Sequence, residues 1–258
     1  MDSENSKTIA LVTGASAGIG AEFCRQLAPR CDVIIATGRR EAPLKALATL
    51  LSADAEVHAI TANLDTREGR ATVIEALRQK GPVDYLVNNA GFSTLGKFDQ
   101  VDIDAQQSMV DVHITATMAL CRAAIPFMRE RVAAGAAPGG IINVSSLASF
   151  GPVPGAAVYS GTKAFLNLFS ESLHQELADD GIPVQSLCPG YTRSEFHDRD
   201  AMADFDRTWV PDEAWMEAAE VVQQSLASLG QGPVVLVPGA HNLDSARKGL
   251  QRGLGKLG

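Results

Sequence analysis

The sequence lacks the features that mark several classes of protein. Its net charge is −8, and no basic block appears in the body of the chain. Both observations argue against a nucleic-acid-binding protein, because such a protein needs a cationic face. The first residues, MDSENSK, contain no apolar segment of the kind found in a signal peptide. The uncharged stretch over residues 132–162 is broken by glycines and prolines, so it cannot form one membrane-spanning helix.

Cysteine is also scarce. The chain has four cysteines, which form no CxxC pair, and no histidine accompanies them at the spacing of a metal site. We therefore expect reduced, buried thiols in a cytoplasmic protein, and no metal site. The four residues are Cys24, Cys31, Cys121 and Cys188.

The sequence does contain a regular alternation of short apolar runs with helical segments of ten or more residues. Such runs are typical of strands buried on both faces, and their alternation with helices favours parallel pairing with right-handed crossovers. From 258 residues with 46% hydrophobic content, we predict a single α/β domain (1–258) with a doubly wound parallel sheet of about seven strands and helices on both faces. The predicted strands are residues 8–13, 32–37, 56–60, 83–88, 140–145, 184–188 and 234–237.

The first predicted strand runs directly into a glycine-rich turn, TGASAGIG (13–20), which a helical segment follows. Gly14 permits the tight turn, and Gly18 and Gly20 let backbone N–H groups and the helix N-terminus approach a pyrophosphate. A loop that merely turns the chain is the alternative. The succession of strand, turn and helix favours a nucleotide site of the Rossmann type.

The spacing T-G-x-x-x-G-x-G resembles that of the short-chain dehydrogenase/reductase family, in its single-domain branch, over about residues 8–238. The resemblance implies cofactor contacts from the glycine turn, from NLD (63–65), from NNAG (88–91) and from the residues that follow Cys188. In NLD, an asparagine replaces the family's usual aspartate. The implied cofactor-binding residues are Gly14, Ser16, Gly18, Ile19, Gly20, Asn63, Leu64, Asn89, Ala90, Gly91, Pro189, Gly190, Thr192 and Ser194.

The end of the second predicted strand, ATGRR (36–40), bears on the choice of dinucleotide. A carboxylate here would accept a hydrogen bond from a ribose 2′-OH and favour NAD. Gly38 stands there instead, followed by Arg39 and Arg40, whose guanidinium groups can pair with a 2′-phosphate. We therefore expect NADP(H) rather than NAD(H), the alternative being two solvated arginines at the start of a helix.

The segment YSGTK places Tyr159 and Lys163 four residues apart, on one face of a predicted helix. A Lys163 ammonium beside the phenol would lower the pKa of Tyr159 and suit it to exchange a proton with a substrate oxygen. Ser146, after the fifth strand, can hydrogen-bond the same oxygen. The resemblance assigns these catalytic roles to the three residues and cofactor contacts to Tyr159 and Lys163. The alternatives are a surface Tyr–Lys pair and serines, Ser145 or Ser146, that only turn the chain.

His113 lies in the amphipathic segment 111–128, at a position where the family usually carries an asparagine that kinks the helix and holds a water leading from the lysine. Three interpretations are open. His113 holds that water or transfers protons itself near neutral pH; it is a neutral structural substitute that hydrogen-bonds a helix carbonyl; or it signals lost activity. A metal site is disfavoured, because no second ligand lies at suitable spacing.

The resemblance implies a reversible hydride transfer between NADP(H) and a ketone or secondary alcohol. An insertion at about residues 194–215 is expected to form a substrate lid, the alternative being a pair of surface helices. An NADP(H)-binding regulator or scaffold without turnover is the alternative function, whereas motif spacing disfavours an enoyl reductase and a sugar-nucleotide epimerase. The likeness of YSGTKAFLNLFSESLHQEL (159–177) to family members that act on steroids or long acyl chains implies a substrate of that kind. The bulky apolar candidate pocket residues, which suggest a lipophilic substrate, are Phe150, Val153, Tyr191, Phe196, Phe205 and Trp209.

The tail, about residues 240–258, carries apolar residues at helical spacing and basic residues on other faces. We expect it to pack over the substrate mouth or against a second subunit; contact with an anionic membrane is the alternative, which the glycines weaken. The resemblance implies a homodimer or homotetramer built on helices near 103–134 and 157–180. The tail residues concerned are Leu243, Ala246, Leu250, Leu254 and Leu257, with Arg247, Lys248, Arg252 and Lys256.

Overall fold

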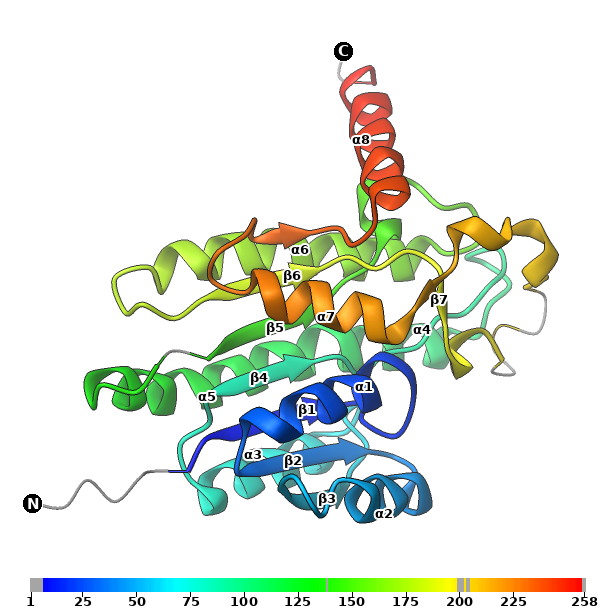
Figure 1. Cartoon of the computed structure of the whole chain (residues 1–258). Coiled ribbons are helices and arrows are strands. Elements are labelled where there is room, and N and C mark those ends of the chain that lie inside the picture. The colour runs from blue at the N-terminus through cyan, green and yellow to red at the C-terminus, as the bar shows by residue number, and fades with distance from the viewer. Residues whose placement is uncertain (1–6, 138, 199–201, 203–204, 257–258) are drawn as a thin grey trace, which may run out of the picture.

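Seven strands form one parallel sheet in the computed structural model, which describes residues 7–137, 139–198, 202 and 205–256 (Figure 1). The strand order is β3-β2-β1-β4-β5-β6-β9, so the winding reverses between β1 and β4. In a doubly wound sheet, that reversal opens a crevice at the carboxyl ends of the strands, where ligands bind. The strands are β1 (Ile9–Thr13), β2 (Val33–Gly38), β3 (Glu56–Thr61), β4 (Tyr85–Asn88), β5 (Gly140–Val144), β6 (Val184–Leu187) and β9 (Val235–Leu236).

Helices cover both faces of this sheet (Figure 1). The predicted fold class is therefore confirmed, and each predicted strand is found within two residues of its predicted bounds. The helices are α1 (Gly18–Leu27), α2 (Glu41–Leu50), α3 (Arg67–Lys80), α4 (Ile103–Val110), α5 (Ala116–Ala133), α6 (Ala157–Glu176), α7 (Ala218–Ser228) and α8 (Ala240–Leu254).

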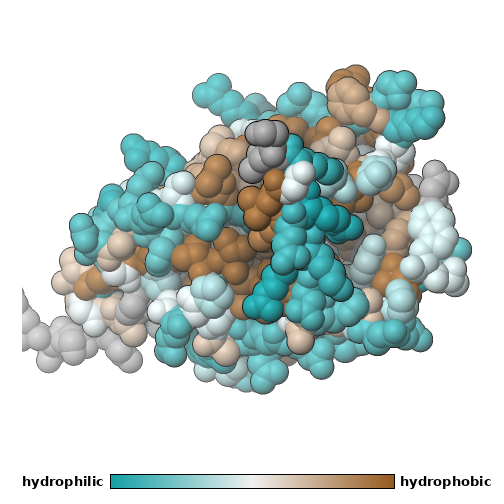
Figure 2. Space-filling model, turned by 90° about the horizontal axis from the view of Figure 1, so that it is seen from above, coloured by the Kyte–Doolittle hydropathy of each residue, from teal (hydrophilic) through white to brown (hydrophobic). Residues whose placement is uncertain are grey.

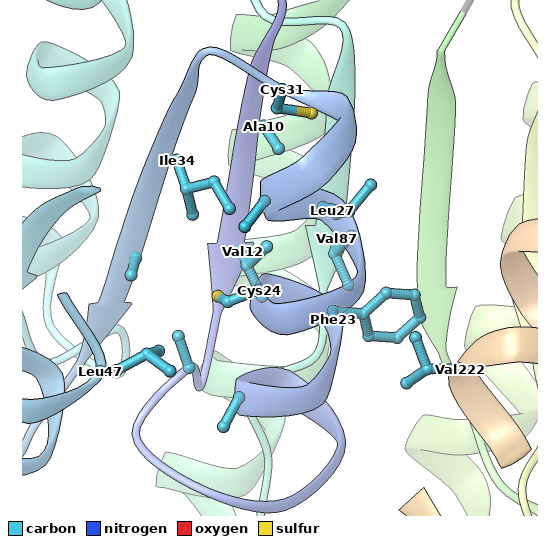
Figure 3. Packing of buried hydrophobic residues seen from close by; sticks show 14 of the residues in the cluster. Ala10, Val12, Phe23, Cys24, Leu27, Cys31, Ile34, Leu47, Val87 and Val222 are labelled. Carbon is cyan, nitrogen blue, oxygen red and sulfur yellow. The ribbon is translucent and has the colours of Figure 1, made fainter. Parts of the chain in front are cut away.

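Two hydrophobic cores lie on opposite faces of the sheet, because successive strand residues point to opposite sides. Residues such as Val12 of β1 pack with α1, α2 and α7, and Figure 3 shows Phe23 of α1 reaching toward Val222 of α7. Leu11 and the other strand residues that point to the opposite face pack with α3, α5 and α6. All four cysteines are buried and free, and burial raises the pKa of the Cys24 thiol to about 12, so this thiol is protonated at neutral pH.

The long helical segment 103–133 is interrupted by a π-helical turn, η2 (Asp111–Thr115), between α4 and α5. A π-helical turn inserts a residue into the helix and is a common cause of kinks. His113 lies in the middle of it and is 1% exposed. A π-helical turn with histidine at its centre therefore stands where the family resemblance implied a kink.

The Asp84–Arg131 ion pair lies at the amino-terminal ends of the central strands, at the edge of the sheet opposite the crevice. Asp84, just before β4, accepts hydrogen bonds from Arg131 Nε of α5 at 2.8 Å and from the Ile9 N–H of β1 at 2.7 Å. Both charged side chains are buried, with exposed fractions of 9% for Arg131 and 3% for Asp84. The pair joins two central strands to a covering helix.

The segment after β6 was predicted as a lid and contains short 3-10 turns and a small sheet rather than a pair of surface helices. β7 (Thr192–Arg193) pairs in parallel with β8 (Met216–Glu217), which the sequence did not predict. Between them lie η4 (Glu195–Asp198), η6 (Arg207–Trp209) and η7 (Asp212–Ala214). Residues 199–201 and 203–204 of this segment lie outside the described residues.

The tail forms α8, whose Asn242, Ala246 and Gly249 are buried against the rest of the protein and whose far end projects outward (Figure 1). Seen from its free end, hydrophobic residues gather along one side of this helix and hydrophilic residues along the other (Figure 2). The exposed leucines are Leu243, Leu250 and Leu254, while Leu257 lies outside the described residues. Among the helices in the part of the chain that the structure describes, none is both long and apolar enough to cross a membrane.

Candidate active site

The glycine turn between β1 and α1 is held against the loop that follows β4. Gly14 and Gly18 have positive φ angles of 66° and 53°, which side chains rarely allow. A Cβ on Gly20 would lie 2.3 Å from the Gly14 carbonyl oxygen, so only glycine fits there. The Thr13 hydroxyl accepts the N–H groups of Asn89 and Ala90, each at 2.9 Å. Thr13 therefore joins the two loops that the sequence predicted as cofactor contacts.

The start of α1 suits a phosphate. Ala17 occupies its N-cap, no side chain caps the helix, and the first turn contains no acidic residue. The N–H groups at a helix start need acceptors, and the positive end of the helix dipole favours an anion. The uncapped helix and the glycine cradle together fit the pyrophosphate of a nicotinamide dinucleotide.

The two arginines after β2 differ in their contacts. Arg40 donates to Glu195 Oε2 at 2.7 Å and lies 3.4 Å from both the carbonyl and the hydroxyl oxygen of Ser16. Arg39 is exposed, and no hydrogen bond or ion pair joins it to another residue that the structure describes. Only Arg40 thus bridges the glycine turn and the segment after β6.

The NLD residues lie beyond the end of β3. Leu64 is buried, and the Asn63 carbonyl accepts the Thr66 hydroxyl at 3.0 Å. Asp65, which the sequence analysis did not assign to the site, accepts the Ser108 hydroxyl of α4 at 2.8 Å. These bonds fix the loop at the carboxyl edge of the sheet, where the predicted cofactor residues gather.

Ser146, Tyr159 and Lys163 are brought together at the ends of β5 and α6. Ser146 caps the 3-10 turn η3 (Leu147–Phe150) by accepting the Ala148 N–H at 3.1 Å, and its hydroxyl interacts with the Tyr159 phenol. Lys163 Nζ lies 5.6 Å from the centre of the Tyr159 ring. Ser145 instead donates its hydroxyl to the Lys163 carbonyl at 2.7 Å. The phenol therefore has Ser146, not Ser145, as its partner.

The expected lowering of the Tyr159 pKa is not found, and burial is the reason. Burial raises the pKa of Tyr159 to about 12, against a smaller opposing effect of the Ser146 hydrogen bond. Burial also lowers the pKa of Lys163 to about 7, so this amine is only partly charged at neutral pH. Its Nζ donates to the Val144 carbonyl at 2.9 Å. A phenol in this setting holds its proton.

His113 uses both ring nitrogens in hydrogen bonds within the protein. The Phe92 N–H donates to Nε2 at 3.2 Å, and Nδ1 lies 2.8 Å from the Thr162 hydroxyl oxygen. That hydroxyl donates its one proton to the Tyr159 carbonyl at 2.8 Å, so Nδ1 must carry the hydrogen that it shares with Thr162. These bonds assign the neutral tautomer protonated on Nδ1.

The charge state of His113 agrees with this tautomer. Burial first, and the nearby Lys163 second, lower the pKa of His113 well below its usual range. Its partners are a hydroxyl and a backbone N–H, not the helix carbonyl that the structural interpretation named. Among the three interpretations, a neutral structural role fits these contacts, because a proton carrier near neutral pH needs a pKa near 7.

The turn after β6 lies against α8. The Pro189 carbonyl accepts the Leu147 N–H of η3 at 2.8 Å, and Thr192 donates its hydroxyl to the Gly190 carbonyl at 3.1 Å. A Cβ on Gly190 would lie 2.3 Å from Asn242 Oδ1 of α8. The turn that was predicted to border the nicotinamide is therefore closed on its outer side by the tail.

The predicted lid carries several aromatic residues, one of which lies beside the reactive tyrosine. The ring of Phe196 lies 6.1 Å from that of Tyr159. Tyr191 stacks with Phe205 at 5.9 Å and lies 5.4 Å from Trp215, a residue that the sequence analysis missed. Of the predicted pocket residues, Phe196 thus lies beside the Tyr159 ring, while Tyr191 and Phe205 belong to a second aromatic cluster.

Other residues of the site had weak signals in the sequence. Thr13 is the first residue of the glycine-rich motif TGASAGIG, so the motif itself indicated that Thr13 belongs to the site. Thr162 lies inside YSGTK, but its bond to His113 spans 49 residues, and the Arg40–Glu195 pair spans 155. Among the described residues, no group of three or more His, Cys, Asp or Glu side chains is placed to hold a metal ion.

A parallel sheet with an uncapped, glycine-rich phosphate cradle and a Ser–Tyr–Lys group beside it defines a nicotinamide-dependent oxidoreductase. Within that class, the chain belongs to the short-chain dehydrogenase family, whose sequence profile, described as short chain dehydrogenase, matches residues 8–203. Members of this family bind a nicotinamide cofactor and act on an alcohol or carbonyl group.

Individual relatives agree with this assignment. The chain is 37% identical over 192 residues to a protein named sulfoacetaldehyde reductase 2 from Chromohalobacter salexigens, covering 73% of this chain and 74% of the relative. A short-chain dehydrogenase from Sphingobium yanoikuyae, solved in complex with NADPH, superimposes with a TM-score of 0.80 at 32% identity, over 95% of each chain. A bulky-bulky ketone specific alcohol dehydrogenase from Comamonas testosteroni gives a TM-score of 0.77 at 26% identity, over 97% of this chain and 95% of that one.

Proposed function

We propose that the protein is an NADP(H)-dependent reductase of ketones, working in reverse on secondary alcohols. The observation that carries this proposal is the partly buried phenol of Tyr159, which interacts with the Ser146 hydroxyl and lies adjacent to Lys163, beside the phosphate cradle. A pKa of about 12 keeps the phenol protonated at neutral pH, which suits a proton donor. That favours the reducing direction.

Each side chain has a distinct role in this proposal. The bound nicotinamide supplies or accepts the hydride. Tyr159 donates its phenolic proton to the carbonyl oxygen, and Ser146 donates a hydrogen bond to the same oxygen and orients it. Lys163 holds the cofactor ribose and sets the electrostatic environment of the phenol. His113 is a positioning residue that ties the Phe92 backbone to α6.

NADP(H) is the proposed dinucleotide because β2 ends on a glycine and two arginines instead of an acid. Arg39 is open to solvent and can pair with a 2′-phosphate. The Sphingobium structure holds NADPH, which supports the choice.

A lipophilic ketone is the proposed substrate class. Phe196 lies close to Tyr159, and Tyr191, Phe205 and Trp215 form an aromatic cluster in the segment after β6. The name of the Comamonas relative points to bulky ketones, whereas that of the Chromohalobacter relative points to a small charged aldehyde. A panel containing both kinds of carbonyl compound separates the two, and a preference for sulfoacetaldehyde would overturn the lipophilic assignment.

The experiment for the reaction follows NADPH oxidation on that panel by the wild type, Tyr159→Phe and the matched control Tyr85→Phe. Tyr85 lies at the start of β4, at the other end of the strand from the site. We expect Tyr159→Phe to lower kcat by roughly 10²–10⁴-fold, the usual contribution of a positioned proton donor, and Tyr85→Phe to leave it within about twofold. Equal rates for wild type and Tyr159→Phe would overturn the mechanism.

A regulator that binds NADP(H) without turnover is the second candidate, favoured by the histidine in place of the family's asparagine. It predicts NADPH binding with no oxidation on any member of the panel. Cofactor binding measured by fluorescence alongside the panel distinguishes the two functions.

We also propose that two or four chains associate through α4, α5 and α6. These helices expose Ile103, Met118 and Leu168, at 66%, 42% and 68% exposure. Large apolar side chains exposed on neighbouring helices are typical of an interface. Light scattering after size exclusion tests this, and a monomer at micromolar concentration would overturn it.

A further inference from the structure

The acid that β2 lacks is supplied by another part of the chain. Glu195, at the start of η4, holds the guanidinium of Arg40 with Nη2 and Oε2 2.7 Å apart. The segment that carries Glu195 lies against the glycine turn, because a Cβ on Gly18 would be 2.9 Å from Ser194 Cβ. Arg40 also approaches Ser16 of that turn. A carboxylate therefore lies at the end of the cofactor crevice where the sequence offers only arginines.

We propose that Glu195 is a specificity-determining residue that weakens the preference for NADP(H) by competing with the 2′-phosphate for Arg40. This inference rests on the proposed function, in which the arginines after β2 receive that phosphate. A 2′-phosphate can use Arg40 fully only after Arg40 leaves Glu195, and a remaining carboxylate repels it. A 2′-hydroxyl is uncharged and does not need the Arg40 guanidinium, so NAD(H) can bind while the Arg40–Glu195 pair stays intact.

The two arginines are unequal under this proposal. Arg39 makes no ion pair with another described residue and is available to a phosphate at once, whereas Arg40 is already engaged. Both members of the Arg40–Glu195 pair are about half exposed, at 48% and 58%. Exposed pairs contribute little and are screened by salt, so the effect on cofactor choice is a modest factor, not a switch.

Glu217 offers a matched control. Its carboxylate pairs with Arg193 Nε at 3.3 Å, so Glu217→Gln removes the same charge from the same segment without touching Arg40. Arg193 also pairs with Asp212 and lies over the Trp215 ring. Any general loosening of the segment would therefore appear in Glu217→Gln as well.

The test measures binding of 2′,5′-ADP and of ADP by titration calorimetry, without turnover. We expect the wild type to bind 2′,5′-ADP more tightly than ADP. Glu195→Gln should tighten 2′,5′-ADP by roughly two- to fivefold at low salt and leave ADP unchanged, since an exposed pair has about that strength. Glu217→Gln should change neither, and the gain in Glu195→Gln should shrink as salt rises.

The outcomes separate the two proposals. If the wild type binds 2′,5′-ADP no more tightly than ADP, the NADP(H) preference fails. If the wild type does prefer 2′,5′-ADP but Glu195→Gln does not strengthen that preference, or Glu217→Gln strengthens it equally, then the role of Glu195 is wrong and the NADP(H) preference stands.

Discussion

The two ends of the crevice are built differently. At the reactive end, His113 and Lys163 are 1% and 4% exposed and their polar atoms have partners within the protein. At the adenosine end, Arg39 and Arg40 are exposed to solvent, and Arg40 pairs with Glu195 of the segment after β6. Burial amplifies electrostatic effects and solvent screens them. Substitutions at the reactive end should therefore change the free energy of unfolding by several kcal/mol. Substitutions at the adenosine end should change the free energy of cofactor binding by about 1 kcal/mol or less.

The largest expected effect belongs to Lys163→Met. Burial lowers the Lys163 pKa to about 7, below the value near 10.5 of an unfolded chain. The unfolded state therefore binds more protons between pH 7 and 10.5, so this lysine destabilises the cofactor-free protein most at and below pH 7, and the penalty disappears as pH rises toward 10.5. Lys163→Met should be inactive, yet more stable than wild type at pH 7 by about 2–4 kcal/mol.

Urea unfolding at pH 7, 8.5 and 10 measures that difference. It should shrink steadily as pH rises, while the control Lys97→Met, at an exposed position, shows no such trend. A stability difference that does not depend on pH would mean that Lys163 is charged in the folded protein.

Gly91→Ala should have the next largest effect. The added Cβ would lie 2.8 Å from His113 Nε2 and 3.6 Å from Lys163 Nζ, in a place where neither side chain is free to move. Such overpacking costs about 1–3 kcal/mol. Combining it with His113→Asn, whose side chain is shorter, should restore part of that loss in thermal or urea unfolding. Strictly additive losses in the double variant would mean that the two residues do not meet.

His113→Asn alone tests the neutral tautomer. A histidine whose pKa lies well below 6.5 in the folded state contributes stability that is complete above pH 6.5 and is lost as pH falls toward the folded pKa. Wild type should lose roughly 1 kcal/mol per pH unit below 6.5 relative to His113→Asn, until the folded histidine protonates. We expect the variant to keep substantial activity. An equal loss in both proteins over pH 5–6.5 would contradict the assignment.

Arg39→Ala should have the smallest effect. Losing one exposed phosphate contact should weaken NADPH binding by roughly two- to tenfold at low salt, with little change for NADH. Fluorescence titrations at two salt concentrations measure it. A loss as large as that of the buried substitutions would mean that the adenosine end closes over its ligand and excludes water.

The difference between the two ends also explains what the sequence could predict. Strand positions and the glycine turn followed from local patterns, because each depends on spacing within one or two elements. The meeting of Ser146 with Tyr159 was implied by the family resemblance, which the spacing of the two motifs supported. The Arg40–Glu195 pair and the β7–β8 sheet could not be predicted, since they join segments that no periodicity connects. The pKa of Tyr159 was predicted in the wrong direction because sequence spacing reveals a neighbouring charge but not the loss of solvent.

The buried pair of Asp84 and Arg131 lies at the opposite edge of the sheet from all of this chemistry. Removing one partner would leave a charge buried without its counterion, which typically costs about 3–5 kcal/mol. That is comparable to the whole margin by which many domains stay folded. Variation at these two positions would thus change how much of the enzyme a cell maintains against proteolysis, while each surviving molecule turns over its substrate as before.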